Sequence, residues 1–209
     1  MSDAEEGFLV VLSDVKAEQD EDYLAWLTTE HVHERLGIPG FLAVRIFMRP
    51  IEGGRQYFIW YELRNADVVD SAAYLDRLNS PTPWSRRIMP ILGNFGRAGG
   101  TVKARRRKEP AGLIMAIGFD AAPSRPENLL EGVAAASGIR SVHFLETDRK
   151  KTELRTNERD LRTSDNTFAG LLLLESDDRE SLHAASATAA LAEAPGIVRI
   201  YQQIFSLRG

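Results

Sequence analysis

The chain has 209 residues, of which 44% are hydrophobic and 27% are charged, and its formal net charge is −4. This composition is that of an ordinary globular protein and excludes collagen-like, low-complexity and wholly disordered chains. Cysteine is absent, which excludes disulfides, thiolate nucleophiles and cysteine-based zinc or iron–sulfur sites. The acidic balance argues against nucleic acid as a partner, because phosphate binding needs clustered positive charge.

The chain shows no sign of a membrane or secretory segment. No apolar run approaches the ~18 residues that a membrane span requires, and the start, Met1–Glu6, is acidic where a secretory signal would be basic. We therefore expect a cytoplasmic protein with no membrane partner.

The first half reads as alternating strands and helices. The expected strands are short apolar runs at 8–15, 41–48, 56–63 and 95–104, and the expected helices lie at 20–36 and 67–78. Acidic residues begin the first helix, and the Pro39–Gly40 pair follows its end. A turn through Gly53–Gly54 predicts that the second and third strands form a hairpin.

The second half repeats this order. Its expected strands are 113–119, 140–146, 168–175 and 197–207, and its expected helices are 126–137 and 178–193. The densely charged stretch 148–166 is interpreted as a long, mobile hairpin connection. The predicted organisation is a disordered N-terminus (1–7), a first half (8–104), a basic linker (105–110) and a second half (111–209).

The order β-α-β-β-α-β in each half is typical of the ferredoxin-like α+β arrangement, with both helices on one face of an antiparallel sheet. Two such units in one chain indicate duplication. Several strands are apolar on both faces, so the sheet face without helices needs a cover. We predict that the tandem units pack sheet to sheet and form a closed α+β barrel within one chain.

The first helix carries the candidate chemistry. On a regular helix Glu30 and Glu34 fall near the middle of the apolar face, with His31 at its edge. Because burying such groups without partners is costly, that end of the helix either protrudes into solvent or lines a wet pocket against the sheet. In the second case His31 is the candidate general acid or base, and Glu30 or Glu34 orients or assists it.

The other candidate site residues are mostly aromatic. The expected substrate-binding side chains are Tyr23, Trp26, Arg45, Trp60, Tyr61 and Trp84. Arg45 interrupts an apolar hairpin and needs an anion, either an acidic ligand or an internal partner such as Glu62. Trp84 lies in a proline-rich segment that forms a lid or is anchored to the core by this side chain.

No metal or cofactor is expected. His31 and His33 diverge by ~200° around a helix and cannot share a metal ion, unlike ligands at i,i+4 spacing. The sequence also lacks the GxGxxG, P-loop and GxSxG patterns of nucleotide cofactors and nucleophile-elbow hydrolases.

A resemblance rests on residues of the first half. The run from Trp26 to Phe41, with His31 and the Ile38–Gly40 turn, together with Tyr57–Leu63 and Ser71–Leu75, is similar to the dimeric α+β barrel superfamily, nearest to EthD-like and related uncharacterised proteins. EthD-like chains carry a helix-borne histidine at a similar interval before a Leu-Pro-Gly turn, which selects His31. The resemblance covers residues 8–97 clearly and 111–207 faintly.

The resemblance implies ferredoxin-like units that pair sheet to sheet. Members include cofactor-free monooxygenases, muconolactone isomerases, polyketide cyclases and haem-handling enzymes, so membership does not select one activity. Haem is less favoured, because no second aromatic-flanked histidine supports ligation. The first helix of the second half has no His, Trp or Tyr, so pocket chemistry is expected in the first half.

We therefore expect a cofactor-independent enzyme or binder of a small apolar or aromatic ligand, of isomerase, cyclase or monooxygenase-like type. The alternative is a non-catalytic α+β barrel that serves as a binding or interaction module, which a pocket filled by side chains would favour. A monomer with an internal pseudo-dimer and a homodimer both remain open.

Overall fold

The computed structural model describes residues 5–107, 109–163, 166–187 and 198–209. Its strands are β1 (Gly7–Lys16), β2 (Phe41–Ile51), β3 (Gly54–Leu63), β4 (Gly93–Arg107), β5 (Leu113–Phe119), β6 (Ser141–Thr147), β7 (Gly170–Ser176) and β8 (Val198–Arg208). Its α-helices are α1 (Asp20–Trp26), α2 (Val32–Leu36), α3 (Ala72–Asn79), α4 (Pro83–Ile88), α5 (Pro126–Ala134), α6 (Arg149–Thr152), α7 (Asn157–Asp160) and α8 (Arg179–Ser186). Short non-α turns are η1 (Ala17–Gln19), η2 (Leu27–His31), η3 (Ala66–Asp70) and η4 (Met89–Ile91).

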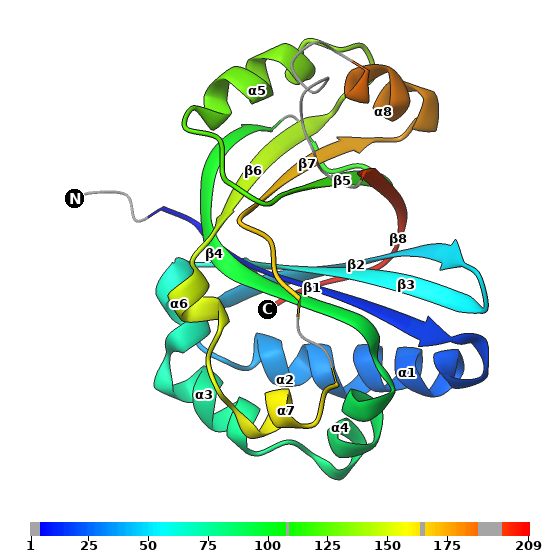
Figure 1. The fold of residues 1–209 in the computed structure, drawn as a ribbon, viewed down its shortest axis with the longest axis vertical. Helices are drawn as coiled ribbons and strands as arrows, with labels where there is room; N and C mark the ends of the chain where they lie inside the picture. Colours follow the sequence, from blue (N-terminus) through cyan, green and yellow to red (C-terminus); the bar gives the residue numbers. More distant parts are fainter. Residues whose placement is uncertain (1–4, 108, 164–165, 188–197) are drawn as a thin grey trace.

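The strands form one closed barrel in the order β1-β3-β2-β8-β5-β7-β6-β4. Every neighbouring pair is antiparallel. Seen in Figure 1, the sheet of the first half and the sheet of the second half face each other, and each carries its helices on the outside. The predicted fold class, a barrel of two ferredoxin-like halves in one chain, is confirmed.

The fourth strand of each half closes the barrel by pairing with the second strand of the other half. β4 pairs with β1 and then with β6, and β8 pairs with β2 and with β5. This double pairing makes β4 long: it runs to Arg107, and Arg105 and Arg106 pair with β6. Residues 105–110 were predicted to be a linker, but β4 continues to Arg107 because it must reach β6 of the other half.

The chain ends also differ from the expected limits. β1 begins at Gly7, inside the segment 1–7 that was expected to be disordered, while residues 1–4 lie outside the described part. The helix expected at 178–193 is described as α8, which ends at Ser186. Ala187 follows as a turn, and residues 188–193 of the expected helix and the expected strand start at 197 fall in the undescribed range 188–197.

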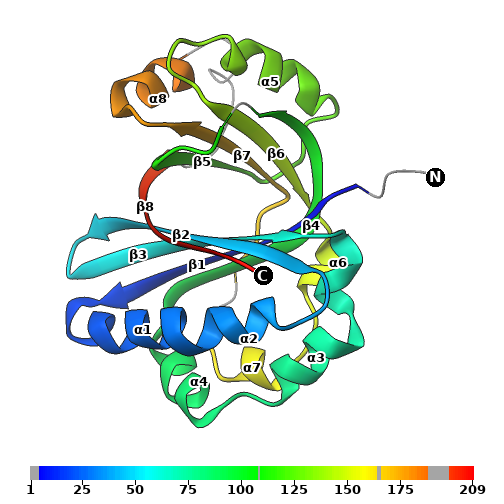
Figure 2. The ribbon, with the colours of Figure 1, turned by 180° about the vertical axis from the view of Figure 1, so that it is seen from behind.

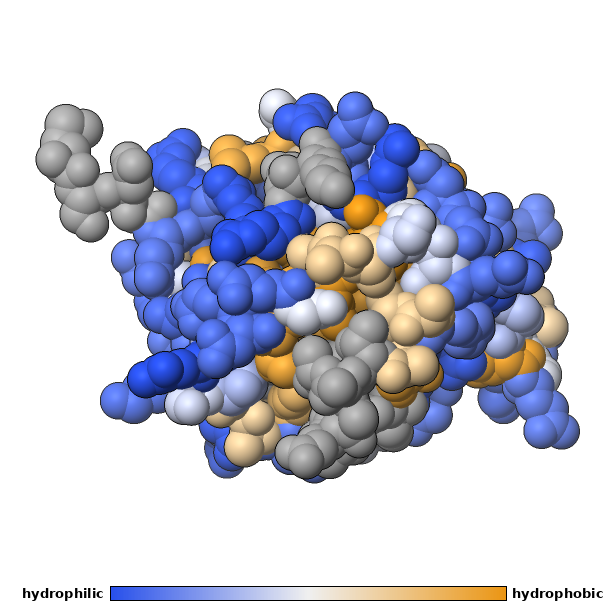
Figure 3. Space-filling view, turned by 90° about the horizontal axis from the view of Figure 1, so that it is seen from above, coloured by the Kyte–Doolittle hydropathy of each residue, from blue (hydrophilic) through white to orange (hydrophobic). Residues whose placement is uncertain are grey.

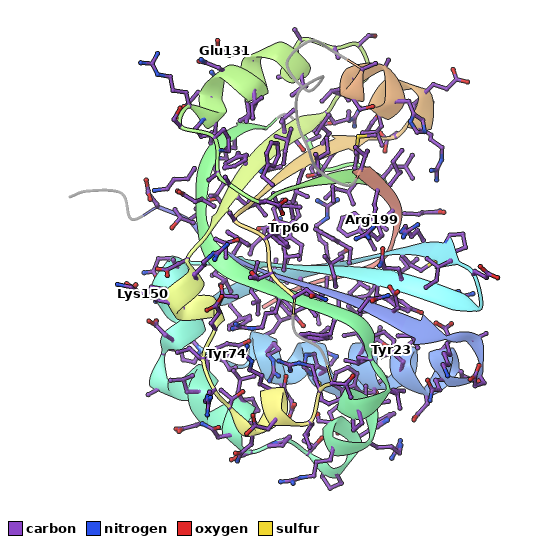
Figure 4. All side chains as sticks on the ribbon, viewed as in Figure 1. Tyr23, Trp60, Tyr74, Glu131, Lys150 and Arg199 are labelled. Carbon is purple, nitrogen blue, oxygen red and sulfur yellow. The ribbon has the colours of Figure 1, made fainter. Side chains whose placement is uncertain are left out.

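Three apolar clusters fill the spaces between the layers. The first lies between the N-terminal sheet and α1–α4, and the second between the C-terminal sheet and α5 and α8. The third fills the barrel and includes Phe8, Phe47, Phe58, Trp60 and Tyr201. Trp60 is accordingly seen between the two sheets in Figure 4. The strands therefore bury both faces, as their double-sided apolar pattern predicts.

The outer face of the second half is mostly hydrophilic. Seen from the side of α5 and α8, hydrophobic residues gather near the middle of this face between hydrophilic rims (Figure 3). Among the described residues, no helix is long and apolar enough to cross a membrane.

A segment of the second half crosses to the first half. We call Asp148–Arg162 the strap; it contains α6, which lies beside η3, and α7, which lies beside α3 in both Figure 1 and Figure 2. Lys151 Nζ contacts Asp67 and Asp70, at 2.6 and 3.0 Å. The stretch predicted to be a mobile connection thus has two short helices and packs over the helix layer of the other half.

Candidate functional site

The first helix contains a π-helical turn that changes which residues face the sheet. At η2 the Val32 N–H donates to the Leu27 carbonyl, an i→i−5 bond that accommodates one extra residue. His31 and Arg35 therefore take the inward positions that a regular helix gives to Glu30 and Glu34. His31 is 8% exposed and Arg35 is 2% exposed. The predicted placement of the two glutamates on the inward face is wrong for this reason.

Side-chain contacts accompany this turn. The hydroxyls of Thr28 and Thr29 donate to the carbonyls of Leu24 and Ala25, a type of contact that bends helices. The Trp26 ring lies 4.3 Å from the His31 ring, measured between centroids. Single π-turns occur often at functional sites. This one places the His31 imidazole in contact with the Trp26 indole.

His31 lines a cavity between the first helix and the N-terminal sheet. The cavity has a volume of about 40 Å³, room for roughly three water molecules. Its aromatic walls are Tyr23, Trp26, Tyr61, Tyr74 and Phe95. Figure 4 shows Tyr23 and Tyr74 in the layer between the sheet and the helices.

The polar wall of the cavity comes from both halves of the chain. The first half supplies His31, Arg35 and Arg97, and the strap supplies Glu158 and Arg162. Arg35 Nη2 lies 2.7 Å from Glu158 Oε2, and Arg97 Nη1 donates to the Thr152 carbonyl at 2.7 Å. The polar wall of the cavity is therefore formed jointly by the first half and the strap.

Three buried polar atoms of this cavity have no hydrogen-bond partner. They are His31 Nδ1, Arg35 Nη1 and the Tyr61 hydroxyl. A buried polar atom without a partner costs about 1–3 kcal/mol, more if it is charged. Native proteins rarely leave several such atoms in one place, so the arrangement points to a polar ligand group or ordered water between them.

Burial sets the protonation states. Burial and the nearby charges of Arg35 and Arg162 hold the pKa of His31 well below its usual value, so the imidazole is neutral at neutral pH. Burial likewise raises the pKa of the Tyr61 hydroxyl, which stays protonated. Burial opposes the charge of Arg35, but Glu158 raises its pKa and keeps it cationic. A neutral base thus lies near a fixed cation.

Four of the predicted site residues come together here, and the other five do not. Tyr23, Trp26, Tyr61 and His31 line the cavity. Glu30 instead accepts a hydrogen bond from the Thr82 hydroxyl at 2.7 Å. Glu34 accepts one from Arg77 at 3.0 Å, and burial raises the pKa of its carboxyl. The helix turn places Glu30 toward the N-terminus of α4 and Glu34 toward α3.

Arg45 and Trp60 lie inside the barrel, away from this cavity. Arg45 Nη1 is 2.7 Å from Glu175 Oε2, an ion pair that joins the two halves. Glu175 also accepts from the Ser141 hydroxyl and the Ala111 N–H. Although burial acts in the opposite direction, His143, the Arg45 charge and the Ala111 N–H lower the pKa of Glu175 to about 2. The anion that Arg45 needs is therefore supplied by the second half.

Trp84 joins α4 to α1. Its indole Nε1 donates to Asp22 Oδ1 at 3.0 Å, and the Arg87 guanidinium lies 5.7 Å from its ring. Of the two uses considered for this residue, the observed contacts are those of an anchor between neighbouring helices.

The charged part of the site was not predicted from the sequence. Arg35 follows His31 at i,i+4 spacing, a signal that it shares the histidine's face. Arg97 stands between Phe95 and Gly99 on β4, so a charge lies on a buried sheet face. Nothing local marks Glu158, which meets Arg35 across 123 positions of sequence.

The described residues contain no group of three or more His, Asp or Glu side chains arranged to hold a metal ion.

Comparisons with known proteins place the fold. No family model matches the chain, and no curated protein resembles it significantly in sequence. An anthrone oxidase-like protein superposes with a TM-score of 0.62 at 12% identity, over 99% of this chain and 94% of its own. A candidate monooxygenase from Fusobacterium nucleatum gives 0.61 at 14% identity, over 100% and 96%. A candidate chlorite dismutase gives 0.55 at 14% identity, over 96% of each chain.

At these identities the similarity is one of fold alone. The chain shares the α+β barrel fold of these structures, with both ferredoxin-like units in a single polypeptide. The nearer resemblance to EthD-like proteins stays a prediction.

Proposed function

We propose that the protein is a small-molecule enzyme that works without a bound cofactor, by proton transfer to His31 in the cavity of the first half. The observation that carries this proposal is the convergence of His31 Nδ1, Arg35 Nη1 and the Tyr61 hydroxyl, all buried and without partners, on one aromatic-walled cavity. A neutral imidazole has a nitrogen lone pair that accepts a proton, and a guanidinium beside it stabilises the anion that forms.

In the proposed step, His31 takes a proton from an activated C–H or from an O–H group of the substrate. The electron pair stays on the substrate as an enolate or phenolate, whose charge Arg35 stabilises. Return of the proton to another atom gives an isomerase or cyclase. Reaction of the anion with O₂ gives a substrate peroxide, which loses water and keeps one oxygen atom as a carbonyl. This is a monooxygenase reaction, the type that the names of two structural neighbours favour.

The size of the cavity favours a second candidate, the non-catalytic binding module. About 40 Å³ is far below the ~300 Å³ of typical ligand pockets. A substrate must therefore displace side chains, and the strap is the part of the wall held largely by polar contacts. If the strap never opens, the barrel has no catalytic site.

Turnover by matched histidine variants tests the proposal. Wild type, His31→Gln and His33→Gln are assayed for O₂ uptake with anthrone and for conversion of a panel of hydroxynaphthoates and enol lactones. His33 is exposed on the same helix, so it is the control. We expect His31→Gln to lose about 100-fold or more in rate and His33→Gln to stay within about twofold of wild type. Equal activity of the two variants would remove His31 from the mechanism, and binding without turnover by wild type would favour the module.

A further inference from the structure

The cavity is strongly cationic. Arg35 and Arg97 of the first half and Arg159 and Arg162 of the strap line it, and among the described residues Glu158 is the one carboxylate in its wall. His31 adds no charge at neutral pH, because burial lowers its pKa. A buried excess of positive charge is unfavourable unless an anion offsets it. The wall is therefore better matched to an anionic ligand than to a neutral one.

The Glu158 carboxylate lies between two of these arginines, Arg35 and Arg162. The carboxylate lies 2.7 Å from Arg35 Nη2 and 3.8 Å from Arg162 Nη1, and the side chain is only 9% exposed. It comes from the strap, whose α7 is tied to α3 through hydrogen bonds from Asn157 to Asn79. Glu158, on the short helix α7 of the second half, thus forms an ion pair with Arg35 of the first half.

Glu158 leaves part of the cationic wall uncompensated. Arg35 Nη1 is buried and has no hydrogen-bond partner. Arg97 is 8% exposed, and no carboxylate of the described residues is paired with it. Both guanidiniums lie against the Tyr74 ring, at 5.6 and 5.7 Å from its centroid. A second planar anion would find a donor on Arg35 and further positive charge on Arg97.

The walls define the rest of the ligand. Trp26, Tyr61 and Phe95 supply flat apolar surface, and the Arg162 guanidinium stacks 4.1 Å from the Phe95 centroid. Such surroundings favour a planar ring system with one charged edge. The ring system requires more space than is present, and that space is gained when Glu158 and its helix move outward.

We propose that the cavity binds a planar aromatic carboxylate whose carboxylate pairs with Arg35, and that Glu158 holds this anion position when no ligand is bound. This inference rests on the proposed function for the location of the site but not on catalysis by His31. Glu158 acts as an internal competitor, so ligand binding exchanges one carboxylate for another on Arg35.

The test compares an acid with its uncharged amide. Affinities of 2-naphthoate and 2-naphthamide are measured by titration calorimetry for wild type, Glu158→Gln and Glu153→Gln. Glu153 is an exposed residue of the same strap, so it controls for net charge. We expect Glu158→Gln to bind 2-naphthoate about tenfold more tightly, with 2-naphthamide changed by less than twofold and with no gain in Glu153→Gln.

Arginine variants complete the test. Arg35→Met leaves Glu158 without its closest partner and risks misfolding, so the double variant Arg35→Met with Glu158→Gln is included. We expect it to bind 2-naphthoate at least tenfold more weakly than Glu158→Gln alone. Equal affinity for acid and amide in wild type, an equal gain in Glu153→Gln, or undiminished binding by the double variant would overturn the proposal. Calorimetry measures binding and not turnover, so 2-naphthoate binding that depends on Arg35 in a protein without turnover would support this inference while the catalytic proposal fails.

Discussion

The two halves cover the same kind of sheet with different helix layers. Between the C-terminal sheet and its helices, the buried side chains are aliphatic and aromatic, with Leu130 and Leu182 at the centre. Between the N-terminal sheet and its helices, His31, Arg35 and Glu158 are buried as well. Among the described residues, the buried charged side chains that lie outside the barrel are all in this N-terminal helix layer. The C-terminal layer is therefore a packed apolar core, whereas the N-terminal layer contains a cavity with polar walls.

The largest expected effect concerns the ion pair that joins the halves. Arg45→Met leaves Glu175 buried without its cation, and we expect a loss of about 3–5 kcal/mol in the free energy of unfolding. The double variant Arg45→Met with Glu175→Leu removes both charges and should recover most of this loss. Urea denaturation followed by circular dichroism measures both. A single variant within about 1 kcal/mol of wild type would show that this pair does not hold the halves together.

The purely apolar layer should respond as a packed core. Leu182 is fully buried on α8, and Leu182→Ala is expected to cost about 2–5 kcal/mol because it leaves a cavity. The neighbouring His183 is exposed, and His183→Ala should stay within about 0.5 kcal/mol. Naphthoate affinity at a temperature where both variants are folded should not change. A coupled loss of affinity would mean that the two layers are not independent.

The polar layer should make stability depend on pH through His31. Its folded pKa is lowered by burial and by the charges of Arg35 and Arg162, so below about pH 6.5 the unfolded chain binds a proton that the folded chain does not. Stability is then lost as pH falls, by up to about 1.4 kcal/mol per pH unit. His31→Gln should remove this component. Unfolding free energies at pH 7, 6 and 5 test it, and identical pH dependence in both proteins would contradict a buried neutral imidazole.

The smallest effect separates a satisfied from an unsatisfied tyrosine. The Tyr61 hydroxyl has no partner, whereas the Tyr23 hydroxyl lies 3.0 Å from the Ser13 hydroxyl. We expect Tyr61→Phe to stabilise the protein by about 1 kcal/mol and Tyr23→Phe to destabilise it by a similar amount. Thermal unfolding of both variants gives the comparison, and a loss of stability in Tyr61→Phe would show that its hydroxyl is already bonded.

The barrel was predictable because the sequence shows which strands are apolar on both faces. Strands such as Phe41–Met48 are apolar on both faces, and such strands must be covered on both sides. The exchange of β4 and β8 between the halves was not predicted. It depends on pairing register over long distances, and a basic stretch such as Lys103–Arg107 resembles a solvated linker when read alone.

The site was predictable only in part. His31 and its aromatic neighbours follow from helical spacing, but the π-turn that moves Arg35 inward and Glu30 outward depends on how the helix packs. The strap has charged residues and no aromatic ones, a composition typical of exposed loops. Glu158 enters the site only because the fold brings the strap against the other half.

A structure of the protein crystallised with 2-naphthoate tests the central claim most directly. The account predicts the ring between Trp26 and Tyr61, the carboxylate on Arg35, and Glu158 moved away from that arginine. A ligand bound in the barrel or on the outer surface, with the Arg35–Glu158 pair unchanged, would contradict it.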